Sequence, residues 1–161
     1  MKRLLFALIA LFLIAPATNT ASAQEDGDFR FGIRTGYYFG VKAYGAGIYG
    51  TYGIADWLNI EPGVNFIFKQ KSTVDVYCDF QIPLEIATYW YVYPIVGVCV
   101  SDISAKNGTV DGWSVGANLG LGLNYEINGR WGVNVQGKWM GRLPGKHRNA
   151  IVTSLGIGYN F

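Results

Sequence analysis

Apolar and polar residues alternate along most of the chain after residue 27. Between 113 and 126, every odd position carries Trp, Val, Ala, Leu or Tyr, and every even position carries Ser, Gly, Asn or Glu. This period of two places successive side chains on opposite faces of an extended strand. The pattern recurs, less clearly in the second segment, and predicts eight strands at 28–39, 44–55, 57–68, 74–88, 91–101, 113–126, 131–140 and 151–161.

The segments that connect these strands alternate between short and longer. The short ones are 54–57, 88–90 and 126–130, and the longer ones are 40–43, 69–73, 102–112 and 141–149. One short connection contains Asn128-Gly129, a strong signal for a hairpin turn. Short turns at one end and longer loops at the other are typical of membrane-spanning antiparallel barrels.

Composition supports a barrel that crosses a membrane. Of the 161 residues, 22 are glycine, 16% are aromatic and only 15% are charged. No apolar run after residue 23 approaches the roughly 18 residues that a membrane-spanning helix needs. A membrane protein without such helices must close its sheet, because only closure pairs every backbone N–H and C=O group. The predicted fold is therefore an all-β, eight-stranded antiparallel up-and-down transmembrane barrel. The net charge of +2 argues against a nucleic-acid partner.

The amino-terminal segment has the features of a signal peptide. Lys2 and Arg3 precede a nearly unbroken apolar run at 4–15, and Ala21-Ser22-Ala23 fits a small-residue cleavage site. The apolar run is short for a membrane-spanning helix, which disfavours an uncleaved anchor. We therefore expect a signal peptide at 1–23 and a single barrel domain at 24–161.

A soluble barrel of the lipocalin type remains an alternative, because the sequence does not state which face of the strands is outside. Lipocalin-like barrels point apolar residues inward and polar residues to water. Aromatic residues at the strand ends favour the membrane, where amphipathic rings lie at headgroup depth. The predicted aromatic girdle is Trp57, Trp90, Trp131, Tyr159 and Phe161.

If the apolar face is outside, the polar face fills the lumen. The predicted lumen residues are Arg30, Arg34, Glu61, Asp79, Gln81, Glu85, Asn118, Asn134, Gln136 and Lys138. Buried charges need partners, and eight strands leave an interior just wide enough for side chains. We expect a structural network that plugs the barrel. A narrow passage for small solutes or ions is the alternative.

Catalytic chemistry is weakly represented. The single histidine, His147, lies between Lys146 and Arg148 in a predicted loop. No serine lies two residues away from it, as the His-x-Ser pattern of lipid A deacylases requires. We find no nucleophile elbow, P-loop or metal-ligand cluster, so no catalytic residue, metal or cofactor is predicted. A lipid-modifying barrel enzyme remains a distant third alternative.

Two further features stay open at the level of sequence. Cys78 and Cys99 lie on adjacent predicted strands, but the alternation puts them on opposite faces, which disfavours a disulfide. The predicted loops are rich in basic residues, which either bind phosphates of an anionic membrane surface or are simply solvated. These residues are Lys42, Lys69, Lys71, Lys106, Arg142, Lys146 and Arg148.

Three segments carry a resemblance to a known class of proteins. The segment 79–86, DFQIPLEI, and the segment 93–98, YPIVGV, resemble two strands of small OmpX/OmpA-type outer-membrane barrels, in particular the porin-family barrels of Bacteroidetes. The last strand, ending in Phe161, resembles the final strand that the barrel-assembly machinery reads. The family pattern favours glycine where Cys99 stands.

The resemblance implies a location and a set of partners. It implies export through the periplasm into the outer membrane of a Gram-negative cell, where lipopolysaccharide and other lipids surround a monomeric barrel. Members of this class act in envelope integrity, adhesion or small-solute passage, so the resemblance implies a fold more specifically than a function.

Overall fold

The computed structural model describes residues 28–68, 73–102, 113–143 and 149–161. These residues contain nine strands: β1 (Phe29–Tyr38), β2 (Ala43–Ala55), β3 (Leu58–Phe68), β4 (Thr73–Gln81), β5 (Leu84–Ala87), β6 (Trp90–Ser101), β7 (Ser114–Asn128), β8 (Trp131–Leu143) and β9 (Ala150–Asn160). The predicted signal peptide at 1–23 lies outside these ranges. So do His147 and five of the basic loop residues, Lys69, Lys71, Lys106, Lys146 and Arg148.

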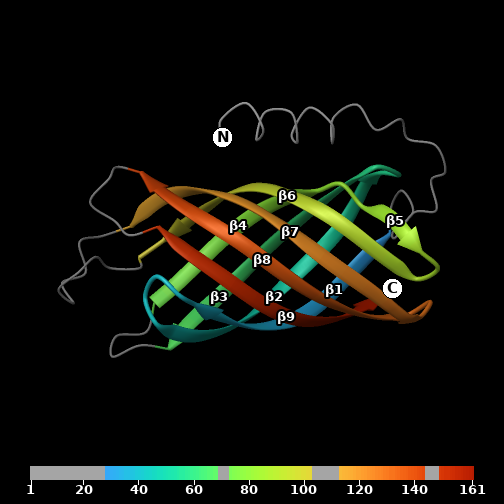
Figure 1. Cartoon of the computed structure of the whole chain (residues 1–161), viewed down its shortest axis with the longest axis horizontal. Helices are drawn as coiled ribbons and strands as arrows, with labels where there is room; N and C mark the ends of the chain where they lie inside the picture. Colours follow the sequence, from blue (N-terminus) through green and yellow to red (C-terminus); the bar gives the residue numbers. More distant parts are fainter. Residues whose placement is uncertain (1–27, 69–72, 103–112, 144–148) are drawn as a thin grey trace.

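The strands form one antiparallel sheet that closes on itself (Figure 1). β1 pairs with β2 on one side and with β9 on the other, and β4 pairs with β6. β4 and β5 together correspond to the single strand predicted at 74–88, and both pair with β6. The interruption falls at Pro83, which has no N–H to donate to a ladder. Counted this way, the barrel has eight strands, as predicted.

The two ends of the barrel differ, as Figure 1 shows. The β2–β3, β5–β6 and β7–β8 turns and Phe161 lie at one end, which we call the turn end. The β1–β2 hairpin and the start of β9 lie at the other, which we call the loop end. At the turn end, Trp57 lies in the turn before β3 and not in a strand. At the loop end, β8 continues to Leu143 instead of ending at 140, because these residues still pair with β7.

The outer face of the barrel is apolar and the inner face is largely polar. Exposed outer side chains include Ile33, Phe66, Val96, Leu121 and Leu155, each about half exposed, between 50 and 59%. Most of the charged and amide side chains that the structure describes in the strands are buried inside. This arrangement is the reverse of a lipocalin-like barrel, so the structure decides between the two sequence-based alternatives. Among the described residues, no helix is both long and apolar enough to cross a membrane.

Candidate functional site: the barrel interior

The centre of the interior is an ion pair between Arg34 on β1 and Glu61 on β3. Arg34 Nη1 donates to Glu61 Oε1 at 2.6 Å, and Nη2 donates to Oε2 at 3.0 Å, so the pair is bidentate. The two side chains are each only 3% exposed. A planar guanidinium matches a carboxylate in this geometry, and both charges are compensated where water is excluded.

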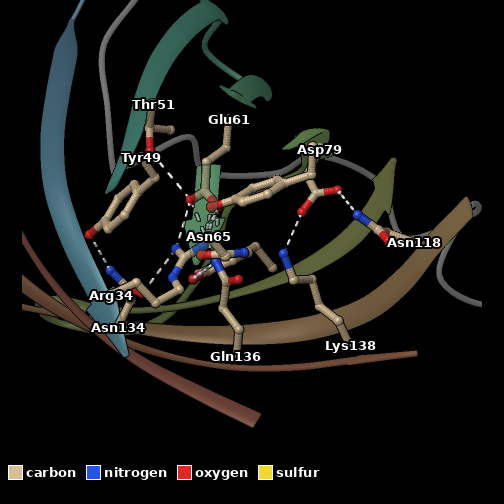
Figure 2. Close-up of polar contacts among 12 residues, drawn as sticks. Arg34, Tyr49, Thr51, Glu61, Asn65, Asp79, Asn118, Asn134, Gln136 and Lys138 are labelled. Atoms are coloured by element: carbon tan, nitrogen blue, oxygen red, sulfur yellow. Dashed lines mark hydrogen bonds and ion pairs between the residues drawn. The ribbon is translucent and has the colours of Figure 1, made fainter. Parts of the chain in front are cut away.

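Neutral side chains add further hydrogen bonds to this pair (Figure 2). The hydroxyl of Tyr77 accepts from Arg34 Nη1 at 2.8 Å, and the side-chain oxygen of Asn134 accepts from Nη2 at 3.2 Å. Gln136 Nε2 lies 3.4 Å from Glu61 Oε1 and donates to the hydroxyl of Tyr93 at 3.1 Å. These bonds link five strands around the interior, so the network ties opposite walls of the barrel together.

A second ion pair lies nearer the loop end. Lys138 Nζ on β8 donates to Asp79 Oδ2 on β4 at 2.8 Å, and Asn118 Nδ2 donates to Asp79 Oδ1 at 2.8 Å. Asp79 is fully buried. The lysine ammonium also lies 4.0 Å from the centroid of the Tyr77 ring, a cation–π contact. Tyr77 therefore contacts both Arg34 and Lys138. It connects the two ion pairs, each of which we call a level of the interior.

A third level lies at the turn end and is centred on Arg30. Its Nη2 forms an ion pair of 2.8 Å with Glu126, and its Nη1 donates to Asn124 at 3.0 Å. Asn160 accepts from Arg30 Nε. The ion pair is more accessible than the central one, because the Glu126 side chain is 13% exposed.

Nine of the ten predicted lumen residues are buried, and the tenth differs. Gln81 is buried beside the central level. Glu85 is exposed. Its partner across the sheet, Tyr91, is buried, so the alternation itself is correct. However, β3 begins at Leu58 and last pairs with β4 at Gln81, so β5 extends past the neighbouring wall. Glu85 therefore lies at the open mouth of the barrel and not in its filled interior.

Three interior tyrosines were missed by the pattern of polar residues. Tyr49, Tyr77 and Tyr93 lie directly across the sheet from Gly32, Gly63 and Gly122, respectively. At each glycine a Cβ atom would lie between 2.2 and 2.4 Å from a ring carbon of the tyrosine. The glycines thus provide the space in which the rings lie flat against the wall. An inward tyrosine opposite an inward glycine is the sequence signal that would have identified these pairs.

Apolar side chains pack together at the loop end of the interior, beside the buried polar residues Asn65 and Asp75. Tyr38, Ile67, Met140, Ala150 and Val152 are each 1–4% exposed and belong to one cluster. By alternation these positions share the inner face with the polar residues, for which the sequence predicts a polar lining. The structure instead stacks an apolar layer on the polar levels.

Two small cavities lie among the described side chains of the barrel interior. A cavity of about 20 Å³ is lined by residues of the central and turn-end levels, including Arg30, Glu61 and Asn124. A second, of about 10 Å³, lies beside Lys138 and Met140. One water molecule needs roughly 10–15 Å³ by this measure. Each of these two cavities therefore has room for about one water molecule.

The five predicted girdle aromatics all lie at the turn end. Trp57, Trp90, Trp131 and Phe161 are between 40 and 77% exposed. The ring of Tyr159 packs edge-on against Trp131 and Phe161, with centroids 5.1 Å apart in both pairs. These rings form a belt on the outer surface at one level of the barrel.

The two cysteines are not joined by a disulfide. Cys78 lies opposite Val98, and Cys99 lies opposite Tyr77, so the cysteines are on opposite faces of the wall. Among the described residues there is no cluster of His, Cys, Asp and Glu able to hold a metal ion.

Comparison with known proteins identifies the fold. No family model and no curated protein sequence matches the chain. The N-terminal β-barrel domain of Pseudomonas aeruginosa OprF is similar with a TM-score of 0.73 and 17% identity, over 86% of this chain and 100% of that one. The fold is that of the small outer-membrane barrels. Neisserial surface protein A is similar with a TM-score of 0.62 and 13% identity, over 83% and 96% of the two chains. The Yersinia pestis attachment protein Ail, solved with the heparin analogue sucrose octasulfate, has a TM-score of 0.54 and 14% identity, over 84% and 99%.

Proposed function

We propose that this chain is a non-catalytic integral protein of the Gram-negative outer membrane that acts in envelope structure or in binding at the cell surface. The exposed apolar wall supports the membrane location, because lipid and not water is the favourable solvent for such a surface. Closure of the sheet supports it as well, since no strand edge then remains unpaired in lipid.

The observation that carries the proposal is the filled interior. The cavities beside the central ion pair are about 20 and 10 Å³. An apolar layer that includes Tyr38, Ile67 and Met140 packs at the loop end, where Asn65 and Asp75 are also buried. A passage for ions or small solutes would require the Arg34–Glu61 pair to break and this layer to separate. A closed, structural barrel therefore fits the interior better than a narrow pore.

The same interior argues against catalysis by its carboxylates. Glu61 and Asp79 are held by Arg34 and Lys138 and are at most 2% exposed as residues. A general acid or base must come within hydrogen-bonding reach of a substrate. The burial and pairing of these two groups therefore support a non-catalytic role.

The remaining parts of the proposal concern export, assembly and partners. Residues 1–23 would direct export through the periplasm, and the final strand with Phe161 would be read by the barrel-assembly machinery. The aromatic belt at the turn end would lie at the periplasmic interface, with lipopolysaccharide around the loop end of a monomeric barrel. The narrower likeness to barrels of Bacteroidetes rests on the sequence segments alone. Binding of a polyanion, as in Ail with sucrose octasulfate, is one form that surface binding by the basic loops could take.

Two measurements on one sample test the proposal. The mature protein is refolded in detergent, run on a denaturing gel with and without boiling, and then added to a planar lipid bilayer. We expect a shift in mobility on boiling and no conductance above that of protein-free membranes, with a general porin as the positive control. Discrete current steps would overturn the closed barrel in favour of the narrow passage. Identical mobility in every detergent would overturn the membrane barrel.

A further inference from the structure

The outer wall of the barrel has a depression over β1 and β2. It has a volume of about 750 Å³, within the range of roughly 300–1,000 Å³ that is typical of ligand sites. Apolar side chains form almost all of its surface. We call it the β1–β2 groove and define it by Ile33, Thr35, Ala46, Ile48, Phe66, Phe68, Leu155 and Ile157.

The register of four strands explains why the wall is hollow at this point. Ala46 on β2 lies opposite Phe66 on β3 and opposite Thr35 on β1, and Thr35 lies opposite Leu155 on β9. One row across the sheet thus places two small residues between two large ones. Neighbouring strands are about 4.8 Å apart, so the floor is about as wide as a single hydrocarbon chain.

Aliphatic side chains border the groove toward the turn end, and two tyrosines, the aromatic rim, border it toward the loop end. Ile33 and Ile48 face each other two residues from the Thr35–Ala46 pair, toward the turn end. Tyr37 and Tyr44 face each other one step toward the loop end, with ring centroids 5.0 Å apart. The Thr35 hydroxyl donates to the carbonyl of Gly45 at 3.1 Å, so the floor offers hydrocarbon no unsatisfied hydroxyl.

A positive charge lies beyond the rim. Lys42 is in the β1–β2 hairpin, where its side chain is exposed. It lies in the turn and precedes Ala46 by four residues, so the two backbones are at most about 13 Å apart. Phe39, in the same hairpin, packs edge-on against Tyr37 at 4.9 Å. Apolar floor, aromatic rim and cation therefore follow one another, which matches the order of acyl chain, interface and phosphate in a phospholipid or glycolipid.

We propose that the β1–β2 groove binds an acyl chain of the phosphorylated glycolipid of the outer leaflet, lipid A, with Lys42 on a lipid A phosphate. The inference rests on the proposed outer-membrane location. The depression favours a bound acyl chain at this place on the wall. Lipid tails are as apolar as the wall, so binding depends on van der Waals packing in a concave surface and not on removal from water.

The test measures bound lipid A by native mass spectrometry of the refolded protein in detergent. Ala46→Leu fills the floor of the groove. Ala117→Leu makes the same exchange at an exposed outer position of β7, away from the groove, and is the matched control. Lys42→Gln removes the charge, and phosphatidylcholine serves as a lipid with acyl chains but no net charge.

We expect the unmodified protein and Ala117→Leu to retain lipid A equally and Ala46→Leu to lose most of it. Lys42→Gln should weaken lipid A binding about fivefold, the usual effect of one basic residue near anionic lipid, and leave phosphatidylcholine binding unchanged. Equal retention by Ala46→Leu and Ala117→Leu would overturn the site. Equal binding of both lipids by the unmodified protein would overturn the phosphate contact. A dimer that Ala46→Leu dissociates would assign the groove to a second copy of the chain.

Failure of this inference differs from failure of the proposed function. Each variant is first checked for the mobility shift on boiling. A shifted variant with unchanged lipid A binding contradicts only the groove. Absence of the shift in the unmodified protein contradicts the membrane barrel itself.

Discussion

Replacing Glu61 with glutamine would leave the Arg34 guanidinium buried without its counter-ion. Both carboxylate oxygens accept hydrogen bonds in the folded barrel. Oε1 accepts from Arg34 at 2.6 Å, and Oε2 accepts from Arg34 at 3.0 Å and lies 3.5 Å from Thr51 Oγ1. An amide keeps one acceptor and replaces the other with an NH₂ group, which would then face an N–H of Arg34.

The size of the effect follows from the burial of the pair. Both side chains are 3% exposed, so water cannot replace the lost charge. Breaking a buried ion pair by removing one partner costs about 3–5 kcal/mol. The remaining amide oxygen retains one bond to Arg34, so we expect a loss of about 3 kcal/mol at the lower end of that range. With a urea slope of about 1–3 kcal/mol per molar, the unfolding midpoint falls by roughly 1–3 M.

The assay is urea unfolding of the refolded barrel in detergent micelles, with the unboiled band on a denaturing gel as the measure of folded protein. Glu126→Gln is the matched control. It makes the same exchange in the more accessible pair with Arg30, and it should lower the free energy of unfolding less than Glu61→Gln does. The double variant Arg34→Gln/Glu61→Gln removes both charges and should be more stable than Glu61→Gln alone.

Two results would refute this reasoning. If Glu61→Gln and Glu126→Gln had equal unfolding midpoints, the burial of the ion pair would not determine how much stability is lost. If Arg34→Gln/Glu61→Gln were less stable than Glu61→Gln, the unpaired charge of Arg34 would not be the source of the lost stability.

Two further predictions concern packing and the thiols. Gly122→Ala would place a Cβ 2.2 Å from the Tyr93 ring, and we expect it to lower the free energy of unfolding by about 1–3 kcal/mol. Gly137→Ala, where no atom lies within 4 Å of the new Cβ, should leave the urea midpoint nearly unchanged, and equal effects would contradict the packing argument. Cys78 and Cys99 lie on opposite faces of the wall, so mild oxidation of the folded barrel should give no intramolecular disulfide. Intact-mass measurement after alkylation in denaturant checks this. A species that carries no alkyl group and is two hydrogens lighter than the reduced, unalkylated protein would contradict the register.

Much of the barrel could be predicted from local pattern alone. The alternation between 113 and 126 puts Asn118 and Asn124 on one face of the strand and Leu119 and Leu121 on the other, as the structure confirms. A strand has only two faces, so one correct assignment orients all its residues. The turn at Asn128-Gly129 was equally readable, because its residue types favour the backbone that a tight hairpin requires.

Other features depend on which strands are neighbours and how far each extends. Glu85 has the right parity for the lumen. It is nevertheless exposed, because the pairing of β3 with β4 stops at Gln81 and no neighbouring wall reaches Glu85. The break at Pro83 was not predicted, although a proline in a strand indicates an interruption. The tyrosine–glycine pairs required the register, since neither member alone predicts the other.

The sequence by itself determined that this protein is a closed barrel of eight strands, because a period of two without spanning helices leaves few ways to satisfy the backbone. It also determined which residues share a face. Only the tertiary structure decided which face is inside, that Arg34 pairs with Glu61 and Lys138 with Asp79, and that an apolar layer packs at the loop end. The physical reason is the range of the interactions. Alternation is a property of a few consecutive residues, whereas ion pairs and cavities join positions that only the closure and register of the whole sheet bring together.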